Sequence, residues 1–236
     1  MKNLTKRFLM PGLLLFCVFE TAHPQGVGRR FVVGRENLCV TEGAIDKTPN
    51  ARLSVDVPKM RAYVNTWVSQ SIESHFTYLG STAQESRLGS GQTRRQLGLK
   101  LRAQDPCNLV YAMWRIEPES KLVVSVKRNP TQHTSAECGN RGYQNIKPRH
   151  FAAVPHLRPG DSHILRAEMH GEDLRVFADD VEVWEGSVGP EAVGLEGPVG
   201  IRSDNVRLEL DLRAGEYVGV HPNYVTTCKS GAEASE

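Results

Sequence analysis

The sequence predicts an all-β protein built as an antiparallel sandwich of two sheets, or jelly roll. Apolar and polar residues alternate along many short segments, which is typical of strands with one face on a core. Turn-forming residues recur at intervals of roughly 8 to 15 residues, as in sandwiches. Helical periodicity is almost absent after residue 25. We therefore expect roughly ten or more strands and few or no helices.

The N-terminus has the features of a secretory signal peptide. A basic start, Lys2 to Arg7, precedes the apolar run 8–19. Such a run is too short to span a bilayer comfortably, and a buried helix is the alternative. We expect residues 1–25 to be removed, which gives a secreted or periplasmic protein without a transmembrane segment.

The remaining chain fits one domain. Residues 26–228 contain no repeat and no internal linker, and the small polar residues of 229–236 indicate a disordered tail. Of the 236 residues, 39% are apolar, which is enough for a core. The formal net charge is only +2, which argues against a nucleic-acid-binding protein.

The strands can be assigned in chain order. Segment 95–102 places three leucines on one face, and segment 205–213 repeats this alternation. Segments 107–116 and 121–127 are apolar on both faces, so we expect a central hairpin covered on both sides. A second hairpin turns at Asp179-Asp180, because aspartate tolerates the left-handed backbone of a tight turn. Further strands are expected at 52–57, 61–64, 72–79, 162–170 and 199–202.

Four cysteines follow the signal segment and predict disulfides. An even number in an exported chain favours disulfides over zinc, and none of them has a closely spaced Cys or His neighbour. Three pairings are open. We favour Cys39–Cys228, which joins the chain ends, and Cys107–Cys138, which closes the irregular segment 129–151.

The second hairpin and the strands after it resemble a known superfamily. Segments 174–186 and 197–212 follow the order strand, turn, strand, glycine-rich loop, strand, strand. This order resembles the C-terminal half of concanavalin A-like jelly rolls, including laminin-G-like domains and domains similar to 3-keto-disaccharide hydrolases. The resemblance covers about residues 52–213. It implies the fold but no single function, because the superfamily includes lectins, glycosidases, lyases and adhesion modules.

One set of side chains suggests a ligand-binding surface. It combines aromatic rings, which stack on sugars, with cations, which bind carboxylates or sulfates. The central strands and the irregular segment would bring these residues together: Tyr111, Arg115, Lys127, Arg128, Arg141 and Tyr143. Our first hypothesis is a non-catalytic carbohydrate- or surface-binding module for a glycan or cell-surface polymer. The alternative for these residues is ordinary packing and solubility.

Two other functions stay open. A glycoside hydrolase or lyase would need paired carboxylates. Its candidates are Glu168, Glu182, Glu209 and Asp211. A structural or interaction protein of the cell envelope is the third hypothesis.

Cofactors are not expected from the sequence. No histidine or cysteine spacing matches a metal motif. Calcium is the one alternative, because Asp204-Asn205 or Asp179-Asp180 could supply oxygen ligands, although these residues are equally good turn formers.

Overall fold

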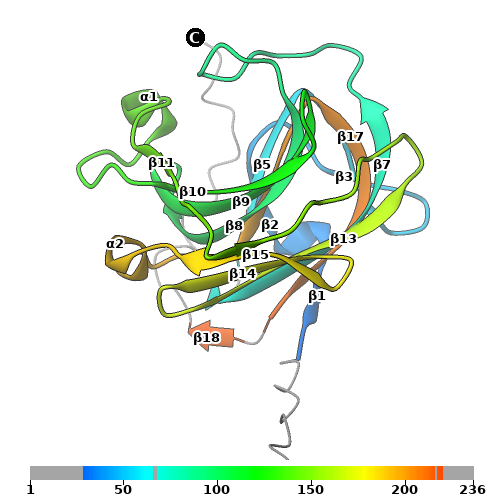
Figure 1. Cartoon of the computed structure of the whole chain (residues 1–236). Coiled ribbons are helices and arrows are strands. Elements are labelled where there is room, and N and C mark those ends of the chain that lie inside the picture. Colours follow the sequence, from blue (N-terminus) through cyan, green and yellow to red (C-terminus); the bar gives the residue numbers. More distant parts are fainter. Residues whose placement is uncertain (1–28, 66–67, 216, 220–236) are drawn as a thin grey trace, which may run out of the picture.

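The computed structural model of the chain describes residues 29–65, 68–215 and 217–219. These residues form two antiparallel sheets that pack face to face (Figure 1), which confirms the predicted fold class. The predicted signal peptide and C-terminal tail lie outside the described residues. Within the described part, no helix is long and apolar enough to cross a membrane.

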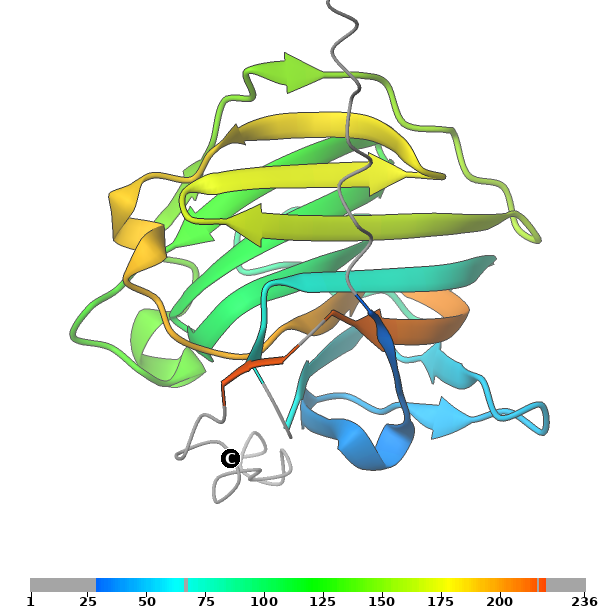
Figure 2. The ribbon, with the colours of Figure 1, turned by 90° about the horizontal axis from the view of Figure 1, so that it is seen from below.

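The larger sheet has nine strands in the described residues. Figure 2 shows three of them, β13, β14 and β15, side by side in front of the other sheet. The order is β12 (His150–Phe151), β15 (Val181–Ser187), β14 (Asp173–Ala178), β13 (Ser162–His170), β7 (Ser71–Ser81), β17 (Val206–Ala214), β4 (Leu53–Asp56) and β3 (Asp46–Lys47), with β1 (Phe31–Val33) also paired to β17.

The second sheet has seven strands and carries the candidate site. Its order is β11 (Tyr143–Asn145), β10 (Lys121–Lys127), β9 (Asn108–Glu117), β8 (Arg95–Asp105), β16 (Gly200–Asp204), β5 (Lys59–Val64) and β2 (Leu38–Glu42). The remaining described elements are small: the pair β6 (Val68–Ser69) and β18 (Tyr217–Gly219), the helices α1 (Ser135–Cys138) and α2 (Pro190–Val193), and the 3-10 turn η1 (Arg35–Asn37).

The core lies between the two sheets. The alternating leucines of β8 and β17 point into it, as predicted, with Leu97, Leu99 and Leu208 fully buried. Trp114 of β9 is also fully buried, and its ring meets Phe76 of β7 edge-on at 5.7 Å between centroids. Burying such side chains is the main favourable contribution to folding.

Both predicted hairpins are present. β9 pairs with β10 and is buried on both faces over most of its length. β14 pairs with β15 through Asp179 and Asp180, whose φ angles are 51° and 63°. Aspartate tolerates this left-handed conformation better than most residues, which explains its place at the turn.

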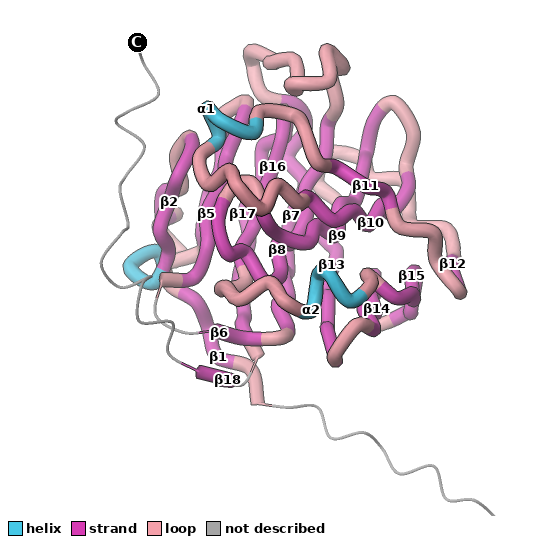
Figure 3. Tube along the Cα trace, turned by 90° about the vertical axis from the view of Figure 1, so that its left-hand side faces the viewer, coloured by secondary structure: helices cyan, strands magenta, loops and turns pink. Residues whose placement is uncertain are grey.

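The irregular segment after β10 is anchored to the second sheet. Cys107 and Cys138 form a disulfide with their Cα atoms 5.8 Å apart, which confirms that predicted pairing. The bridge holds α1 and the chain leading to β11 beside β10 (Figure 3). Cys39 is fully buried in β2. Cys228 lies outside the described residues, so the second pairing stays a prediction.

Candidate functional site

The outer face of the seven-stranded sheet carries an array of polar side chains. Alternate residues of each strand point away from the core. The register aligns Ser125, Tyr111 and Lys100 across three neighbouring strands. The next row joins Met113, Gly98 and Arg202 on β9, β8 and β16.

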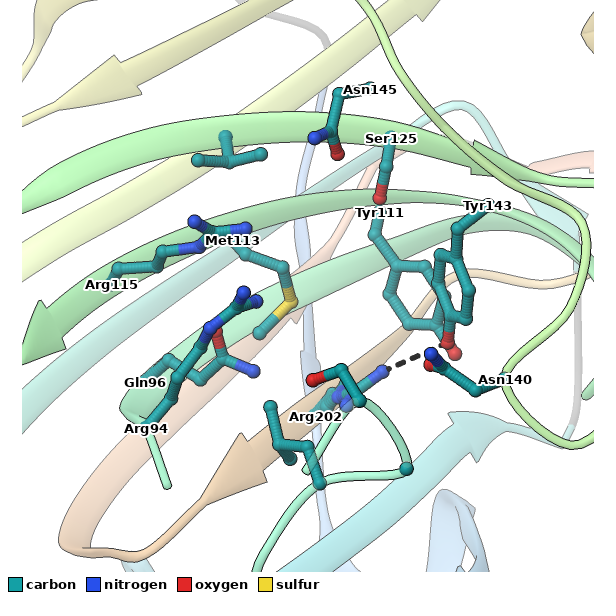
Figure 4. A pocket seen from close by; sticks show the side chains of 14 residues that line it. Arg94, Gln96, Tyr111, Met113, Arg115, Ser125, Asn140, Tyr143, Asn145 and Arg202 are labelled. Atoms are coloured by element: carbon teal, nitrogen blue, oxygen red, sulfur yellow. Dashed lines mark hydrogen bonds between the residues drawn. The ribbon is translucent and has the colours of Figure 1, made fainter. Parts of the chain in front are cut away.

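A pocket of about 210 Å³ lies on this face and is open on one side. Strands β8, β9, β10, β11 and β16 contribute to it, as do the segment before β8 and the segment after α1. The lining residues are Leu88, Gly89, Ser90, Arg94, Gln96, Tyr111, Met113, Arg115, Val123, Ser125, Asn140, Tyr143, Asn145 and Arg202. Figure 4 shows Arg94 and Arg115 together at one end and Tyr143 and Asn140 at the other.

Two tyrosines form the aromatic end of the pocket. The rings of Tyr111 and Tyr143 stack with centroids 6.0 Å apart and planes 25° apart. Tyr111 is only 4% exposed, whereas Tyr143 is 38% exposed. Burial raises the pKa of Tyr111 to about 12, so its hydroxyl stays protonated at neutral pH. Tyr143 is therefore the ring that a ligand can contact.

A buried ion cluster lies beside the tyrosines. The Asp204 carboxylate accepts hydrogen bonds from Arg61 at 2.5 Å, Gln96 at 2.7 Å and Arg202 at 3.0 Å. Burial alone would raise the pKa of Asp204, but the charges of Arg202 and Arg61 outweigh burial and lower it. The same pairing raises the pKa of Arg202 against the effect of its own burial. These groups are charged at neutral pH.

Arg202 links this ion cluster to the aromatic end. Its guanidinium donates to the Tyr143 hydroxyl at 3.3 Å and lies 5.1 Å from the centroid of the Tyr111 ring. It crosses the sheet above Gly98, its neighbour on β8. A Cβ at Gly98 would lie 2.4 Å from the Met113 sulfur. A larger residue at position 98 would therefore collide with Met113, which lines the pocket.

Lys100 lies under this group of side chains and is 6% exposed. Within the described residues its ammonium makes no hydrogen bond or ion pair. Burial, and then the charges of Arg61 and Arg202, lower the pKa of Lys100 to about 7. Alternation puts Lys100 on the face of β8 opposite the core leucines, where it is nevertheless buried, beside Tyr111 on β9 and close enough to Arg61 and Arg202 for their charges to act on it.

Arg94 and Arg115, at the end of the pocket opposite the tyrosines, have fewer protein partners than Arg202. Arg94 bonds to Gln92, and Arg115 has a buried Nε without a hydrogen-bond partner. Neither forms an ion pair with a carboxylate among the described residues. Burial, and then the charge of Arg94, lower the pKa of Arg115.

Two contacts fix the segment before β8. The Asn205 side chain donates to the backbone carbonyls of Ser86 and Arg94, both at 2.9 Å. A Cβ at Gly89 would lie 3.1 Å from Cβ of Asn140, so this segment closely approaches the chain after α1. The pocket walls are thus tied to the sheet and approach each other.

The structure brings together four of the six residues proposed from the sequence: three line the pocket, and the Lys127 ammonium lies 5.1 Å from the centroid of the Tyr143 ring. Tyr111, Arg115 and Tyr143 line the pocket. Lys127 is buried and does not line the pocket, and its ammonium donates to the carbonyls of Pro106 at 3.0 Å and Gly139 at 2.8 Å. Burial lowers the pKa of Lys127. This lysine holds the disulfide-bonded segment in place.

The other two arginines also lie outside the pocket lining. Arg128 lies 3.6 Å from the Glu191 carboxylate. Arg141 donates to the carbonyls of Glu137 and Cys138 at the end of α1. The contacts of Arg128 and Arg141 are therefore with α2 and α1, outside the pocket.

Sequence reasoning missed several lining residues, including Arg94, Gln96, Asn140 and Arg202. Arg202 and Asp204 alternate along one strand, which was a usable signal for a shared face. Their neighbours were not predictable, because β16 pairs with β8 and β5 from distant parts of the chain.

The carboxylates considered for hydrolysis lie on the outer face of the other sheet. Each is paired with an arginine. The pairs are Glu168 with Arg30 and Arg166, Glu182 with Arg175, and Glu209 and Asp211 with Arg52.

The aspartates considered for calcium have protein partners as well. Asp204 belongs to the buried ion cluster, Asp179 bonds to His163 at 2.6 Å, and Asp180 lies near Arg166. In the described part of the chain, no group of three or more His, Cys, Asp or Glu side chains is placed to hold a metal ion.

No protein-family model matches the chain, and no curated protein matches it. Among solved structures, the carbohydrate-binding module CBM66 from Bacillus subtilis is 13% identical, with a TM-score of 0.49 over 74% of this chain and 91% of that one. A tetrameric galectin from the sponge Cinachyrella sp. is 14% identical, with a TM-score of 0.40 over 67% of this chain and 100% of that one. Domain 4 of the arabinanase AbnA from Geobacillus stearothermophilus is 14% identical, with a TM-score of 0.42 over 86% of this chain and 89% of that one. At these identities, nothing about the ligand of this chain follows from them.

Proposed function

We propose that this chain is a secreted or periplasmic, non-catalytic carbohydrate-binding module, and that the pocket on the seven-stranded sheet binds the glycan. The observation that carries the proposal is the composition of the pocket. An exposed tyrosine, three amide side chains and three arginines converge on one open hollow. Aromatic rings stack on sugar rings, and amides and guanidiniums can hydrogen-bond to sugar hydroxyls.

The rigidity of the pocket supports this proposal. Arg202 is fixed by Asp204, Tyr143 stacks on Tyr111, and Asn205 holds the segment that carries Arg94. A site whose side chains are already ordered loses less conformational entropy when it binds.

The disulfide Cys107–Cys138 supports the proposed location. Such bonds persist in oxidising compartments and are rare in the cytosol. The basic and apolar N-terminus is consistent with export to such a compartment.

The first test is a glycan array, with neutral and acidic sugars, probed with the purified mature protein with and without calcium. We expect selective binding. In Tyr143→Ala, affinity for the best glycan should fall by about two- to tenfold, because an aromatic contact contributes about 0.5–1.5 kcal/mol. The affinity is measured by isothermal titration calorimetry.

The matched control is Phe151→Ala. Phe151 is 74% exposed on β12, the edge strand of the other sheet, so its loss should leave affinity unchanged. Equal losses in both variants would contradict the proposed site. Hydrolysis of the bound glycan, followed by chromatography of the products, would contradict the non-catalytic role.

A further inference from the structure

The charge of the pocket is not balanced along its length. At the aromatic end, Arg202 shares the buried Asp204 carboxylate with Arg61. At the other end, Arg94 and Arg115 form no ion pair with a carboxylate among the described residues, although the charge of Glu119 acts on Arg115 from a greater distance. All charged side chains that line the pocket are arginines. The excess positive charge is therefore concentrated at the end formed by Arg94 and Arg115.

We infer that Arg94 and Arg115 bind an anionic group, a carboxylate or a sulfate, on the glycan that occupies the pocket. This inference rests on the proposed glycan binding and names the class of sugar. Guanidinium is the cation that best matches the planar fork of a carboxylate and also binds the oxygens of a sulfate.

The immediate surroundings of Arg115 favour such a ligand. Its buried Nε has no hydrogen-bond partner within the described residues. A buried donor left without a partner costs about 1–3 kcal/mol. The repulsion between the two arginines opposes the empty arrangement, and an anion bound between them would relieve it. The buried Nε shows that no group of the described residues satisfies this guanidinium fully.

The remaining lining suits the rest of an acidic sugar. Figure 4 places Met113 between the arginines and the tyrosines, and Gln96 beside Arg94. If an acidic sugar residue of the glycan binds at the arginine end, the next sugar residue would lie over Met113 and extend towards Tyr143. The amide of Gln96 bonds to Asp204 at 2.7 Å and is held in place. Charge recognition and ring contact would thus act on one oligosaccharide.

The test compares oligosaccharides that differ only in the anionic group. One pair is an oligogalacturonide and its carboxyl-reduced form, and the other is a sulfated galactan oligosaccharide and its desulfated form. We expect the wild-type protein to prefer an anionic member by about tenfold or more, because hydrogen bonds to charged groups contribute about 1.5–3 kcal/mol. The pair that shows this preference identifies carboxylate or sulfate as the ligand group.

Arg94→Gln and Arg115→Gln should each reduce the preference, and the double variant should bind both members of the pair equally. Higher salt should weaken binding of the anionic member only. The control is Arg128→Gln, an arginine at the edge of the same sheet that pairs with Glu191 and does not line the pocket. Melting temperatures report whether each variant is folded.

Two results would overturn the inference, and only one of them would also contradict the proposed glycan binding. If neutral and anionic members bind equally to the wild-type protein, the anionic subsite is wrong while glycan binding survives. If no glycan on the array binds and neither pair is bound, the proposed function fails and the inference fails with it.

Discussion

Lys100 is the residue whose surroundings most clearly oppose its charged form. It is buried on the outer face of the seven-stranded sheet, without a hydrogen-bond partner among the described residues. The charged groups that act on it come from three neighbouring strands. They are Arg61 on β5, Arg202 and Asp204 on β16, and Glu42 on β2. Burial and the two arginines outweigh the carboxylates, so the pKa falls to about 7 from 10.5.

This lowered pKa predicts a dependence of stability on pH. Between pH about 7 and 10.5 the unfolded chain binds a proton at Lys100 that the folded protein releases. Stability should therefore rise with pH in this window, by at most about 1.4 kcal/mol per pH unit from this group. The substitution Lys100→Met should flatten the rise, and it should stabilise the protein most at pH about 7 and below, where the folded protein holds Lys100 in its charged form.

Urea unfolding at several pH values across this window measures the effect. Lys121→Met is the matched control, because the Lys121 side chain is 42% exposed. Parallel stability curves for wild type and Lys100→Met would contradict the assignment.

Asp204 has the opposite role, because its charge holds two arginines. Asp204→Asn leaves Arg61 and Arg202 without their shared buried carboxylate, and we expect a loss of about 3–5 kcal/mol. Asp211→Asn removes a carboxylate that is 47% exposed and should cost about 1 kcal/mol or less. Denaturant unfolding at neutral pH compares the two. Similar losses would show that the buried cluster contributes no more than a surface pair.

The same cluster should also weaken in acid. The folded pKa of Asp204 lies below its ordinary value of 3.8. Its contribution to stability is therefore present above pH about 4 and is lost as pH falls through the folded pKa. The Asp204→Asn variant should lack this part of the acid dependence.

At the level of elements, the disulfide-bonded segment forms one wall of the pocket. The bond closes a stretch of 31 residues that includes β10 and α1. Removing it in the Cys107→Ser, Cys138→Ser double variant should cost about 4 kcal/mol of stability by the loop-entropy relation. It should also weaken glycan binding, because Asn140 and Tyr143 lie just beyond the bridge.

Thermal unfolding and calorimetric titration at a temperature where the variant is folded separate these effects. Unchanged affinity in a folded variant would show that Lys127 and the β10–β11 pairing are enough to position this wall.

Elements differ in how well the sequence predicts them. The long strands β8 and β17 could be identified from alternation, and β9 from an apolar run that covers both of its faces. The turn between β14 and β15 could be identified from its two aspartates. Short edge strands such as β3 and β12 have two residues each, too few to show a period. Their pairing depends on neighbours that only the folded chain supplies.

The site was less predictable than the fold for a related reason. Tyr111 and Arg115 alternate on a single strand, so their shared face could be inferred. Arg202 joins them only through the pairing of β16 with β8, residues about a hundred positions apart. Lysines are ordinarily exposed, but Lys127 is buried under the disulfide-bonded segment and Lys100 is buried on the outer face of the sheet, which no local sequence pattern indicates.

For the whole molecule, the two outer faces of the sandwich have different electrostatic arrangements. On the nine-stranded sheet, carboxylates and arginines form ion pairs, for example Glu73 with Arg30 at 3.0 Å. On the seven-stranded sheet, the pocket is lined by three arginines, and two of them, Arg94 and Arg115, form no ion pair with a carboxylate among the described residues. This difference predicts that ligands bind to one face only.

The most direct measurement of this claim is an NMR titration of the isotope-labelled mature protein with the best oligosaccharide from the array. We expect amide shift changes on β8, β9, β11 and β16 and in the segments around Arg94 and Asn140, with little change on β13, β14 and β15. Shift changes centred on the nine-stranded sheet, or no changes at saturating oligosaccharide, would contradict the assignment of the pocket as the glycan site.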